Sequence, residues 1–180
     1  MTTYVALLRG INVGGKHRLP MQELRDILSA QGCEDVRTYI QSGNAVFNAA
    51  NNLESFGTQV TAVIEQQYGF APSVHILALD DYRRILNANP FPDAAAEPKS
   101  LHVAFLTGAA TAPDFDAIEA LSSATENYRL VDGAFYLHAP DGIGRSKLAA
   151  KIDKCLGVAT TGRNWRSAQA IAELAESIIS

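Results

Sequence analysis

The stretch Gly10–Lys16, within "LRGINVGGKHRLP", has the spacing G-x-x-x-x-G-K, which is the first seven positions of a phosphate-binding P-loop. In a P-loop the next residue is Ser or Thr, its hydroxyl binds Mg²⁺, and the helix begins there. Here the next residue is His17, which cannot replace a hydroxyl as the ligand of a hard cation, and the helical pattern begins only at Pro20. The sequence therefore does not predict triphosphate hydrolysis.

Two basic stretches remain as candidates for binding a small anion. Residues 9–18 hold three bases and no acid, and residues 145–166 hold six bases and one acid. Residues 49–143, by contrast, hold 12 acids and 4 bases, so the bases are concentrated within an acidic chain. A glycine-rich turn offers backbone amides to an anion, and neighbouring cations add attraction. We therefore expect the two stretches to form one electropositive site for a nucleotide or a phosphorylated metabolite.

The side chains expected at this site are bases, amides and small residues at turns or helix starts. In "PDGIGRSKLAAKI", Ser146 can cap a helix that begins at Lys147, and the free amides at that helix end favour an anion. The same residue types also have a structural explanation, because a Ser cap, a Gly-Gly turn and a Ser-Gly-Asn hairpin turn need no ligand. The expected ligand-binding set is Arg9, Asn12, Gly14, Gly15, Lys16, Gln41, Asn44, Arg145, Ser146, Lys147, Arg163 and Asn164.

Metal binding, cofactor binding and covalent catalysis have no recognisable pattern in the sequence. His75, His102 and His138 fall in separate predicted strands, without H-x-H or H-x-x-x-H spacing. Cys33 and Cys155 are far apart and form no C-x-x-C pair, which predicts free thiols rather than a disulfide. Because no Ser lies in a G-x-S-x-G motif, we assign no catalytic residue, no cofactor and no metal.

The hydrophobic pattern of the first half of the chain predicts the order β-α-β-β-α-β. "TYVALLR" predicts a strand, and the following segment places apolar residues on one face of a helix that starts at Pro20 and stops at Gly32. "DVRTYIQSGNAVFN" predicts a hairpin that turns at Ser42–Asn44, because Gly and Asn tolerate positive φ. A second helix, capped by Asn52 and ended by Gly69, precedes the strand "SVHILAL". This is the ferredoxin-like arrangement, with both helices on one face of an antiparallel sheet.

The same pattern recurs 98 residues later, which indicates an internal repeat. "HVAFLTG" matches "YVALLRG" at four of seven positions. A helix, a hairpin that turns at Asp132–Gly133 and a further helix follow. We expect the last strand, within residues 157–163, to be stunted because this segment is short and polar, and we expect Asn164 to cap a C-terminal helix.

The predicted fold class is therefore α+β, a two-layer α/β architecture of tandem ferredoxin-like βαββαβ units with an additional C-terminal helix. The predicted divisions are a first unit over residues 1–79, a helix and linker over 80–99, a modified second unit over 100–163 and the C-terminal helix over 164–180.

Five motifs, in this order, resemble the bacterial family known as domain of unknown function 1697. They are "LRGINVGGK", Pro20-Met21 before "LRDILSAQG", "TYIQSGNAVF", "GIGRSKL" and "ATTGRNWRS", and the resemblance spans essentially the whole chain. It implies a two-part α/β structure with ferredoxin-like topology. It implies no activity, because none is established for the family. The sequence departs from the usual Thr-Arg-Asn-Trp of the family at Gly162, which lies between Thr161 and Arg163.

Composition predicts a globular protein and leaves two alternative functions. The 180 residues are 47% hydrophobic with a net charge of −4, lack an apolar run that could span a membrane and begin without signal-peptide features, so we expect a cytoplasmic protein without a membrane partner. One alternative is a single-stranded nucleic-acid-binding module, although the RNA-binding signature of ferredoxin-like sheets is absent. The other is a protein-interaction domain without a ligand. The strand aromatics that bear on the first alternative are Tyr4, Tyr39, Phe47, Tyr128 and Tyr136.

Overall fold

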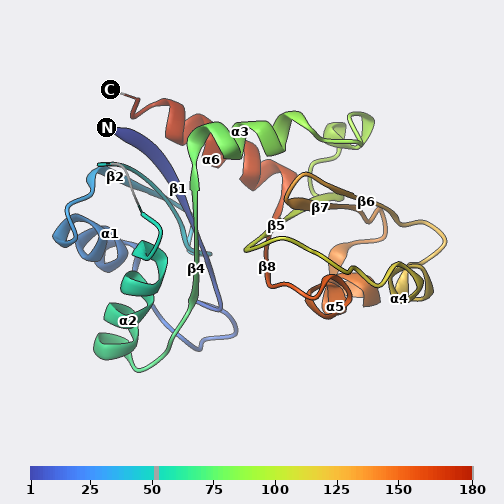
Figure 1. The fold of residues 1–180 in the computed structure, drawn as a ribbon, viewed down its shortest axis with the longest axis horizontal. Coiled ribbons are helices and arrows are strands. Elements are labelled where there is room, and N and C mark those ends of the chain that lie inside the picture. The colour runs from blue at the N-terminus through green and yellow to red at the C-terminus, as the bar shows by residue number, and fades with distance from the viewer. Residues whose placement is uncertain (51–52, 180) are drawn as a thin grey trace. The chain divides into compact units, whose positions relative to one another are not determined.

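The computed structural model of the chain describes residues 1–50 and 53–179 and divides into two compact units (Figure 1). Unit 1 comprises Met1–Arg83 with Ala170–Ser180, and unit 2 comprises Arg84–Gln169. Within the described ranges, no helix has both the length and the apolar character needed to cross a membrane. Each unit is a ferredoxin-like βαββαβ fold, as the sequence predicts.

Unit 1 is an antiparallel four-stranded sheet with two helices on one face. Its strand order is β2-β3-β1-β4, which places the first and third strands of the βαββαβ order in the centre. The elements are β1 (Thr2–Arg9), α1 (Met21–Ala30), β2 (Glu34–Tyr39), β3 (Asn44–Ala49), α2 (Phe56–Tyr68) and β4 (Ser73–Ala78).

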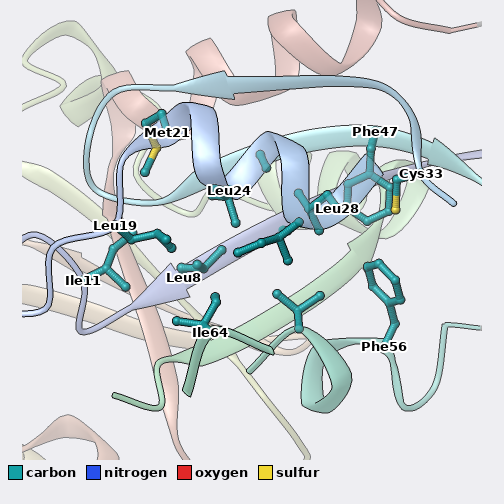
Figure 2. Packing of buried hydrophobic residues seen from close by; sticks show 14 of the residues in the cluster. Leu8, Ile11, Leu19, Met21, Leu24, Leu28, Cys33, Phe47, Phe56 and Ile64 are labelled. Atoms are coloured by element: carbon teal, nitrogen blue, oxygen red, sulfur yellow. The ribbon is translucent and has the colours of Figure 1, made fainter. Parts of the chain in front are cut away.

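The core of unit 1 lies between this sheet and the two helices (Figure 2). Alternate residues of β1 and β3, among them Leu8 and Phe47, point to the helices because successive strand side chains face opposite sides. Leu24 and Leu28 meet them from α1, since residues four apart lie on one helical face. Burial of these side chains provides the main driving force for the local fold.

Unit 2 repeats the arrangement with strand order β6-β7-β5-β8. Its core, which includes Ile118 of α4 and Leu148 of α5, covers one face of the sheet. The additional helix α6 begins in unit 2 and ends in unit 1, and α3 runs from unit 1 into unit 2. The elements are α3 (Leu79–Asn87), a 3₁₀ turn (Asp93–Ala96), β5 (Leu101–Leu106), α4 (Phe115–Leu121), β6 (Asn127–Val131), β7 (Ala134–His138), a 3₁₀ turn (Ile143–Arg145), α5 (Lys147–Leu156), β8 (Thr160–Asn164) and α6 (Trp165–Glu176).

The internal repeat is confirmed by equivalent hydrogen bonds as well as by equivalent topology. The Leu8 amide donates to the Gly43 carbonyl oxygen at 2.8 Å, and the Leu106 amide donates to the Gly133 carbonyl oxygen at 2.9 Å. Both glycines close a hairpin with a positive φ, of +85° and +87°. The two units therefore share the contact that fixes the central strand against the hairpin.

The prediction of a stunted last strand is wrong. β8 has five residues, and each pairs with a residue of β5, so the ladder is as long as the one between β5 and β7. The segment is polar because β8 is an edge strand, and Thr160 is fixed at its start by donating its amide and hydroxyl to Asp153 Oδ1 at 3.1 and 2.7 Å. Gly162 pairs with Ala104 in the middle of this ladder without interrupting it.

The first hairpin also differs from its prediction in detail. The positive φ values fall on Ile40 and Gly43, not on Asn44, which is the buried first residue of β3. The Asn44 side chain closes the turn by donating to the Tyr39 carbonyl oxygen and to Ser42 Oγ, both at 3.0 Å. Its amide group therefore replaces the backbone conformation that the sequence suggested.

The predicted helix boundaries hold at some ends and fail at others: α2 begins at Phe56 with Ser55 as its N-cap, three residues later than predicted, and α6 ends at Glu176, before the predicted end of the chain. Helix α1 begins at Met21 with Pro20 as its extended N-cap, one residue later than predicted, because Pro20 has ψ of 142°. Gly69 ends α2 in the left-handed conformation, as predicted. Asn52, the predicted cap of α2, lies outside the described residues.

Candidate functional site

Loop 9–18 of unit 1 is a small hairpin rather than a phosphate loop. Val13 and Lys16 form a bridge across the Gly14-Gly15 turn, with the Lys16 amide donating to the Val13 carbonyl oxygen at 3.0 Å. Ile11 within the loop and Leu19 directly after it are almost completely buried. Figure 2 shows both side chains near Leu8 in the core of unit 1. The tip of the hairpin is thus held at both ends, and the helix starts well beyond Lys16, which excludes P-loop geometry.

Asn12 is the residue that holds this loop to the neighbouring hairpin. Its Oδ1 accepts from the Leu19 amide at 2.9 Å, and its Nδ2 donates to the carbonyl oxygens of Leu19 at 2.9 Å and Gln41 at 2.8 Å. The structure therefore brings the predicted residues Asn12 and Gln41 together, but through the Gln41 backbone. The side-chain hydrogen bonds of Asn12, like those of Asn44, stabilise the two turns.

His17 and the bases of loop 9–18 have different environments. His17 donates from Nδ1 to the Gly10 carbonyl oxygen at 2.9 Å and stacks on Phe70, with 4.7 Å between ring centroids. Lys16 and Arg18 are exposed, and their side chains form no hydrogen bond or ion pair within the part of the chain that the structure describes. Arg9 is also exposed. The imidazole is structural, whereas the two unpaired bases are available to a partner.

In unit 2, the predicted residues Arg145, Ser146 and Lys147 lie at the start of α5. Ser146 Oγ accepts from the Ala149 amide at 3.0 Å, which confirms the predicted cap. The amides of Lys147 and Leu148, at the first two helical positions, have no acceptor among the described residues. This helix end therefore carries free donors and a partial positive charge.

The start of α6 has a similar arrangement. Asn164 Oδ1 accepts from the Ser167 amide at 2.8 Å, so Asn164 is the predicted cap as well as the last residue of β8. Arg163 lies on the face of the sheet opposite to α5, because it pairs with Val103, whereas the neighbouring residues Thr160 and Asn164 alternate to the other face. The structure thus separates Arg163 from Ser146 by the thickness of the sheet.

Two neighbouring hollows lie beside these helix starts. A smaller one of about 210 Å³ contains Arg145 and Ser146, and a larger one of about 370 Å³ contains Arg166 of α6. They share Ala139 and Gly142 as a common wall. The other lining residues are Ser123, Glu126 and Asp141 in the smaller hollow, and Glu97, Pro98, Lys99, Ser100 and Pro140 in the larger.

The acids and bases of the smaller hollow and Arg166 of the larger one differ in whether their side chains already have a hydrogen-bond partner. Asp141 Oδ2 accepts from Thr125 Oγ1 at 2.6 Å, and Glu126 Oε2 accepts from the Ser123 amide at 2.9 Å. Neither Arg145 nor Arg166 has a side-chain hydrogen bond or ion pair in the described ranges. In the larger hollow, the side chains of Glu97, Lys99 and Arg166 all lack a partner among the described residues, so two unpaired bases stand against one unpaired acid, and this excess favours an anionic ligand.

The sequence identified part of this region and missed part of it. Arg166 belongs to the basic stretch 145–166, which was the available signal, but it was not among the predicted ligands. Lys99 and Ser100 follow a Pro- and Ala-rich linker and gave no signal. Their position results from the sheet, since Ser100 precedes β5 and its carbonyl oxygen accepts from the Ala139 amide at 2.8 Å, beside the smaller hollow.

Two buried donors near β8 lack a hydrogen-bond partner in the part of the chain that the structure describes. Thr161 is completely buried on the same face as Arg163, and its Oγ1 has no hydrogen-bond partner among the described residues. Trp165 is buried at the start of α6, and its Nε1 is also unpartnered there. The burial of Trp165 agrees with a packing role for this side chain.

The cysteines and histidines form no reactive or metal-binding cluster in the described ranges. Cys33 and Cys155 are free and buried, and burial raises the pKa of the Cys33 thiol to about 11, so the thiolate nucleophile is not formed near neutral pH. Burial lowers the pKa of His75 and, against a smaller opposing hydrogen bond to Lys99, that of His102. No group of three or more potential metal ligands occurs among residues 1–50 and 53–179.

Four of the five strand aromatics pack inward, whereas Tyr39, the last residue of β2, is half-buried. Tyr4 stacks on Phe47 in the core of unit 1, and Tyr128 stacks on Phe135 in the core of unit 2. Tyr136 is completely buried and donates its hydroxyl to the Ile85 carbonyl oxygen. Base stacking on a ferredoxin-like sheet needs exposed aromatic rings, which these side chains do not supply.

Comparison with known proteins agrees with the fold. The model of the family described as protein of unknown function (DUF1697) matches residues 1–136, which include loop 9–18 but end before Arg145. Among solved structures, a conserved bacterial protein from Streptococcus pneumoniae is similar, with a TM-score of 0.72 and 26% sequence identity. The similarity covers 97% of this chain and 98% of that protein. No curated protein matches the chain.

Proposed function

The chain belongs to the family of proteins of unknown function DUF1697, whose description names no activity, and we propose that it binds a small anionic molecule at the helix starts of unit 2. The ligand class is a phosphorylated metabolite or a nucleotide. The observation that carries the proposal is the pair of hollows in which Arg145 and Arg166 have no side-chain partner among the described residues, while the nearby carboxylates of Glu126 and Asp141 are already hydrogen-bonded.

The position of the hollows beside two helix starts supports an anion over a neutral ligand. The free amides of Lys147 and Leu148 add donors next to Arg145, and the dipole of the ten-residue helix α5 favours negative charge there. Arg145 and Arg166 can each bind two oxygens of a phosphate or carboxylate, because the guanidinium presents paired donors. Ser146 contributes less, since its hydroxyl oxygen caps the Ala149 amide.

The size of the hollows supports a small molecule rather than a polymer. The larger hollow, of about 370 Å³, falls in the range that holds small ligands, and the smaller one adds about 210 Å³ across the shared wall of Ala139 and Gly142. A sugar phosphate or a mononucleotide fits these dimensions. We propose binding and no reaction.

The test is a thermal-shift screen of nucleotides, sugar phosphates and inorganic phosphate on the purified chain, followed by calorimetry of each compound that stabilises it. A ligand present at about 100 times its Kd raises the free energy of unfolding by about 2.7 kcal/mol. Arg145→Gln and Arg166→Gln should each weaken binding by about 10- to 100-fold, since a hydrogen bond to a charged group contributes about 1.5–3 kcal/mol. Lys154→Gln, an exposed change at the last turn of α5, is the matched control.

Two results would contradict the proposal: no compound in the screen stabilises the protein, or the stabilising compounds bind both arginine variants as tightly as the control. The prediction that loop 9–18 contributes to the same ligand is tested by Lys16→Gln and by Arg163→Gln. A loss of affinity in either variant would extend the site to those residues.

We also propose a cytoplasmic location for the protein. The free cysteines Cys33 and Cys155 support this location, because thiols stay reduced there.

A further inference from the structure

We propose that the loop-tip surface of unit 1, defined as Val13, Lys16, Arg18 and Ile40, docks onto a partner protein that presents an apolar pocket rimmed by carboxylates. This inference is independent of the anion site in unit 2. It rests on the exposure, the backbone conformation, the rigidity and the charge of two adjoining turns.

Two aliphatic side chains are unusually exposed at these turns. Val13 is 69% exposed at the tip of loop 9–18, and Ile40 is 50% exposed at the tip of the hairpin between β2 and β3. Asn12 joins the two turns through its hydrogen bond to the Gln41 carbonyl oxygen. The two turns that carry Val13 and Ile40 are therefore adjacent, so these exposed apolar residues are not scattered singly over the unit.

The backbone at Ile40 makes its side chain more notable. Ile40 has a φ of +47°, a region that disfavours β-branched residues and that Gly or Asn would occupy with less strain. An isoleucine here is unfavourable in two ways, since the backbone is strained and apolar surface faces water. Such outliers persist where the side chain has a use, and contact with a partner is a use that would offset both costs.

The two turns are held rigidly in place. Ile11 and Leu19 anchor loop 9–18 in the core of unit 1, as Figure 2 shows, and the Val13–Lys16 bridge fixes the tip between them. Residues opposed in an antiparallel bridge place their side chains on the same side, so the side chains of Lys16 and Val13 lie on the same side of the hairpin. A surface that is already ordered loses little conformational entropy on binding.

The charge around the two turns defines the chemistry of the partner. Neither residues 9–18 nor residues 36–49 contain an acid, and the side chains of Lys16 and Arg18 are unpaired within the described residues. The complementary surface is therefore acidic at its rim and apolar at its centre. Interfaces of this kind combine an anchored apolar contact with charges that guide association.

A protein fits this surface better than a nucleic acid or a membrane. Proteins that bind single-stranded nucleic acid stack bases on aromatic side chains, and the loop-tip surface has none. Segments that insert into the membrane interface use Trp, Phe and Leu, whereas Val13 and Ile40 are β-branched. Stiff β-branched side chains suit a shaped protein pocket because few rotamers are lost when they are buried.

The experiment selects peptides from a random phage-displayed library on the immobilised full-length chain and measures their affinity for three variants. Val13→Ser combined with Ile40→Asn removes the apolar contact, and Asn tolerates the backbone of position 40, so this variant should fold. Lys16→Gln combined with Arg18→Gln removes the charge. Ile179→Ser is the control, since Ile179 is equally exposed, at 52%, but lies at the other end of the chain.

The expected result is a set of peptides that combine Asp or Glu with large apolar residues and that compete with one another. They should bind the control like the unaltered chain, lose about tenfold or more in affinity for the Val13→Ser, Ile40→Asn variant, and bind the charge variant more weakly at low salt. Three results would overturn the proposal. The first is that the library yields no such peptides, and the second is that the peptides bind all variants equally. The third is that binding depends on Val13 and Ile40 for a different ligand, either vesicles of phosphatidylglycerol and phosphatidylcholine or a single-stranded oligonucleotide, and not for the peptides.

Discussion

Replacing Gly43 by Ala should destabilise unit 1 much more than the equivalent change, Gly133→Ala, destabilises unit 2. The two glycines occupy the same position in the two repeats and have nearly the same φ, +85° and +87°. They differ in their surroundings. A Cβ at Gly43 would lie 2.7 Å from Leu8 Cβ and 2.7 Å from Ile11 Cδ1, whereas nothing lies within 4 Å of a Cβ at Gly133.

The size of the difference follows from separating backbone strain from steric overlap. A side chain in the left-handed region costs about 1–2 kcal/mol, and both substitutions carry this cost. Overpacking adds about 1–3 kcal/mol at Gly43 only, because the Leu8 Cβ is attached directly to a central strand and cannot rotate away. We therefore expect a loss of about 2–5 kcal/mol for Gly43→Ala and about 1–2 kcal/mol for Gly133→Ala.

Native-state hydrogen exchange with mass spectrometry can measure the two effects separately. Peptides from β3 report on the opening free energy of unit 1, and peptides from β7 report on that of unit 2. Gly43→Ala should reduce protection in β3 by the larger amount, and a peptide containing Leu8, whose amide donates to the Gly43 carbonyl oxygen, should also lose protection. The reasoning is refuted if Gly133→Ala reduces protection in β7 by as much as Gly43→Ala reduces it in β3.

Four further predictions concern single side chains. Thr161→Val should leave the free energy of urea unfolding unchanged or raise it by up to about 1 kcal/mol, because the hydroxyl is buried without a partner among the described residues; a clear loss would show that this hydroxyl is bound. Ser146→Ala should lower it by about 1 kcal/mol through loss of the α5 cap, and no loss would contradict the cap. Burial lowers the pKa of His75 in the folded protein below 6.5, so stability should fall as the pH drops from 6.5 towards the folded-state pKa. His75→Gln should reduce this fall in thermal melts from pH 7 to pH 5. An unchanged fall would refute a contribution of His75 to the pH dependence. With a pKa raised to about 11, Cys33 should resist iodoacetamide at pH 8 in the folded protein and react after unfolding, and rapid labelling of the folded chain would refute this.

The fold was predictable because its signals are local and repeat. Hydrophobic spacing, helix-ending glycines such as Gly69 and the Asp132–Gly133 turn all agree with one topology, and the second repeat confirms the first. The failures came where a side chain substitutes for a backbone preference. Asn44, the first residue of β3, closes the preceding turn with its side chain, and Asp153 fixes the start of the polar strand β8. Neither contact can be recognised from the spacing of residues in the sequence.

The candidate site was predictable only in part because ligand residues are gathered by the sheet rather than by the sequence. The cap at Ser146 and the bases around it follow from local patterns. The contribution of Lys99 and Ser100 does not, since they approach the hollows only because β5 and β7 pair, and this pairing joins segments that lie far apart in the sequence. Similarly, charge counting grouped Arg163 with Arg145, whereas strand alternation places Arg163 on the opposite face.

The differences between the two repeats separate structural residues from functional candidates. The repeats share the Leu8–Gly43 and Leu106–Gly133 hydrogen bonds, the strand order and the helix-facing cores, all of which any ferredoxin-like unit needs. The segments that follow the first strand of each repeat, by contrast, differ.

In unit 1, β1 is followed by the bridged hairpin with its exposed Val13. In unit 2, β5 is followed by Thr107, which donates its amide and hydroxyl to the Ala159 carbonyl oxygen, both at 3.0 Å. A loop that protrudes in one copy of a duplicated fold, and is tied down in the other, is not required for folding. We therefore expect substitutions on the loop-tip surface to alter binding without lowering stability, and Ile40→Asn to raise stability by relieving the positive φ.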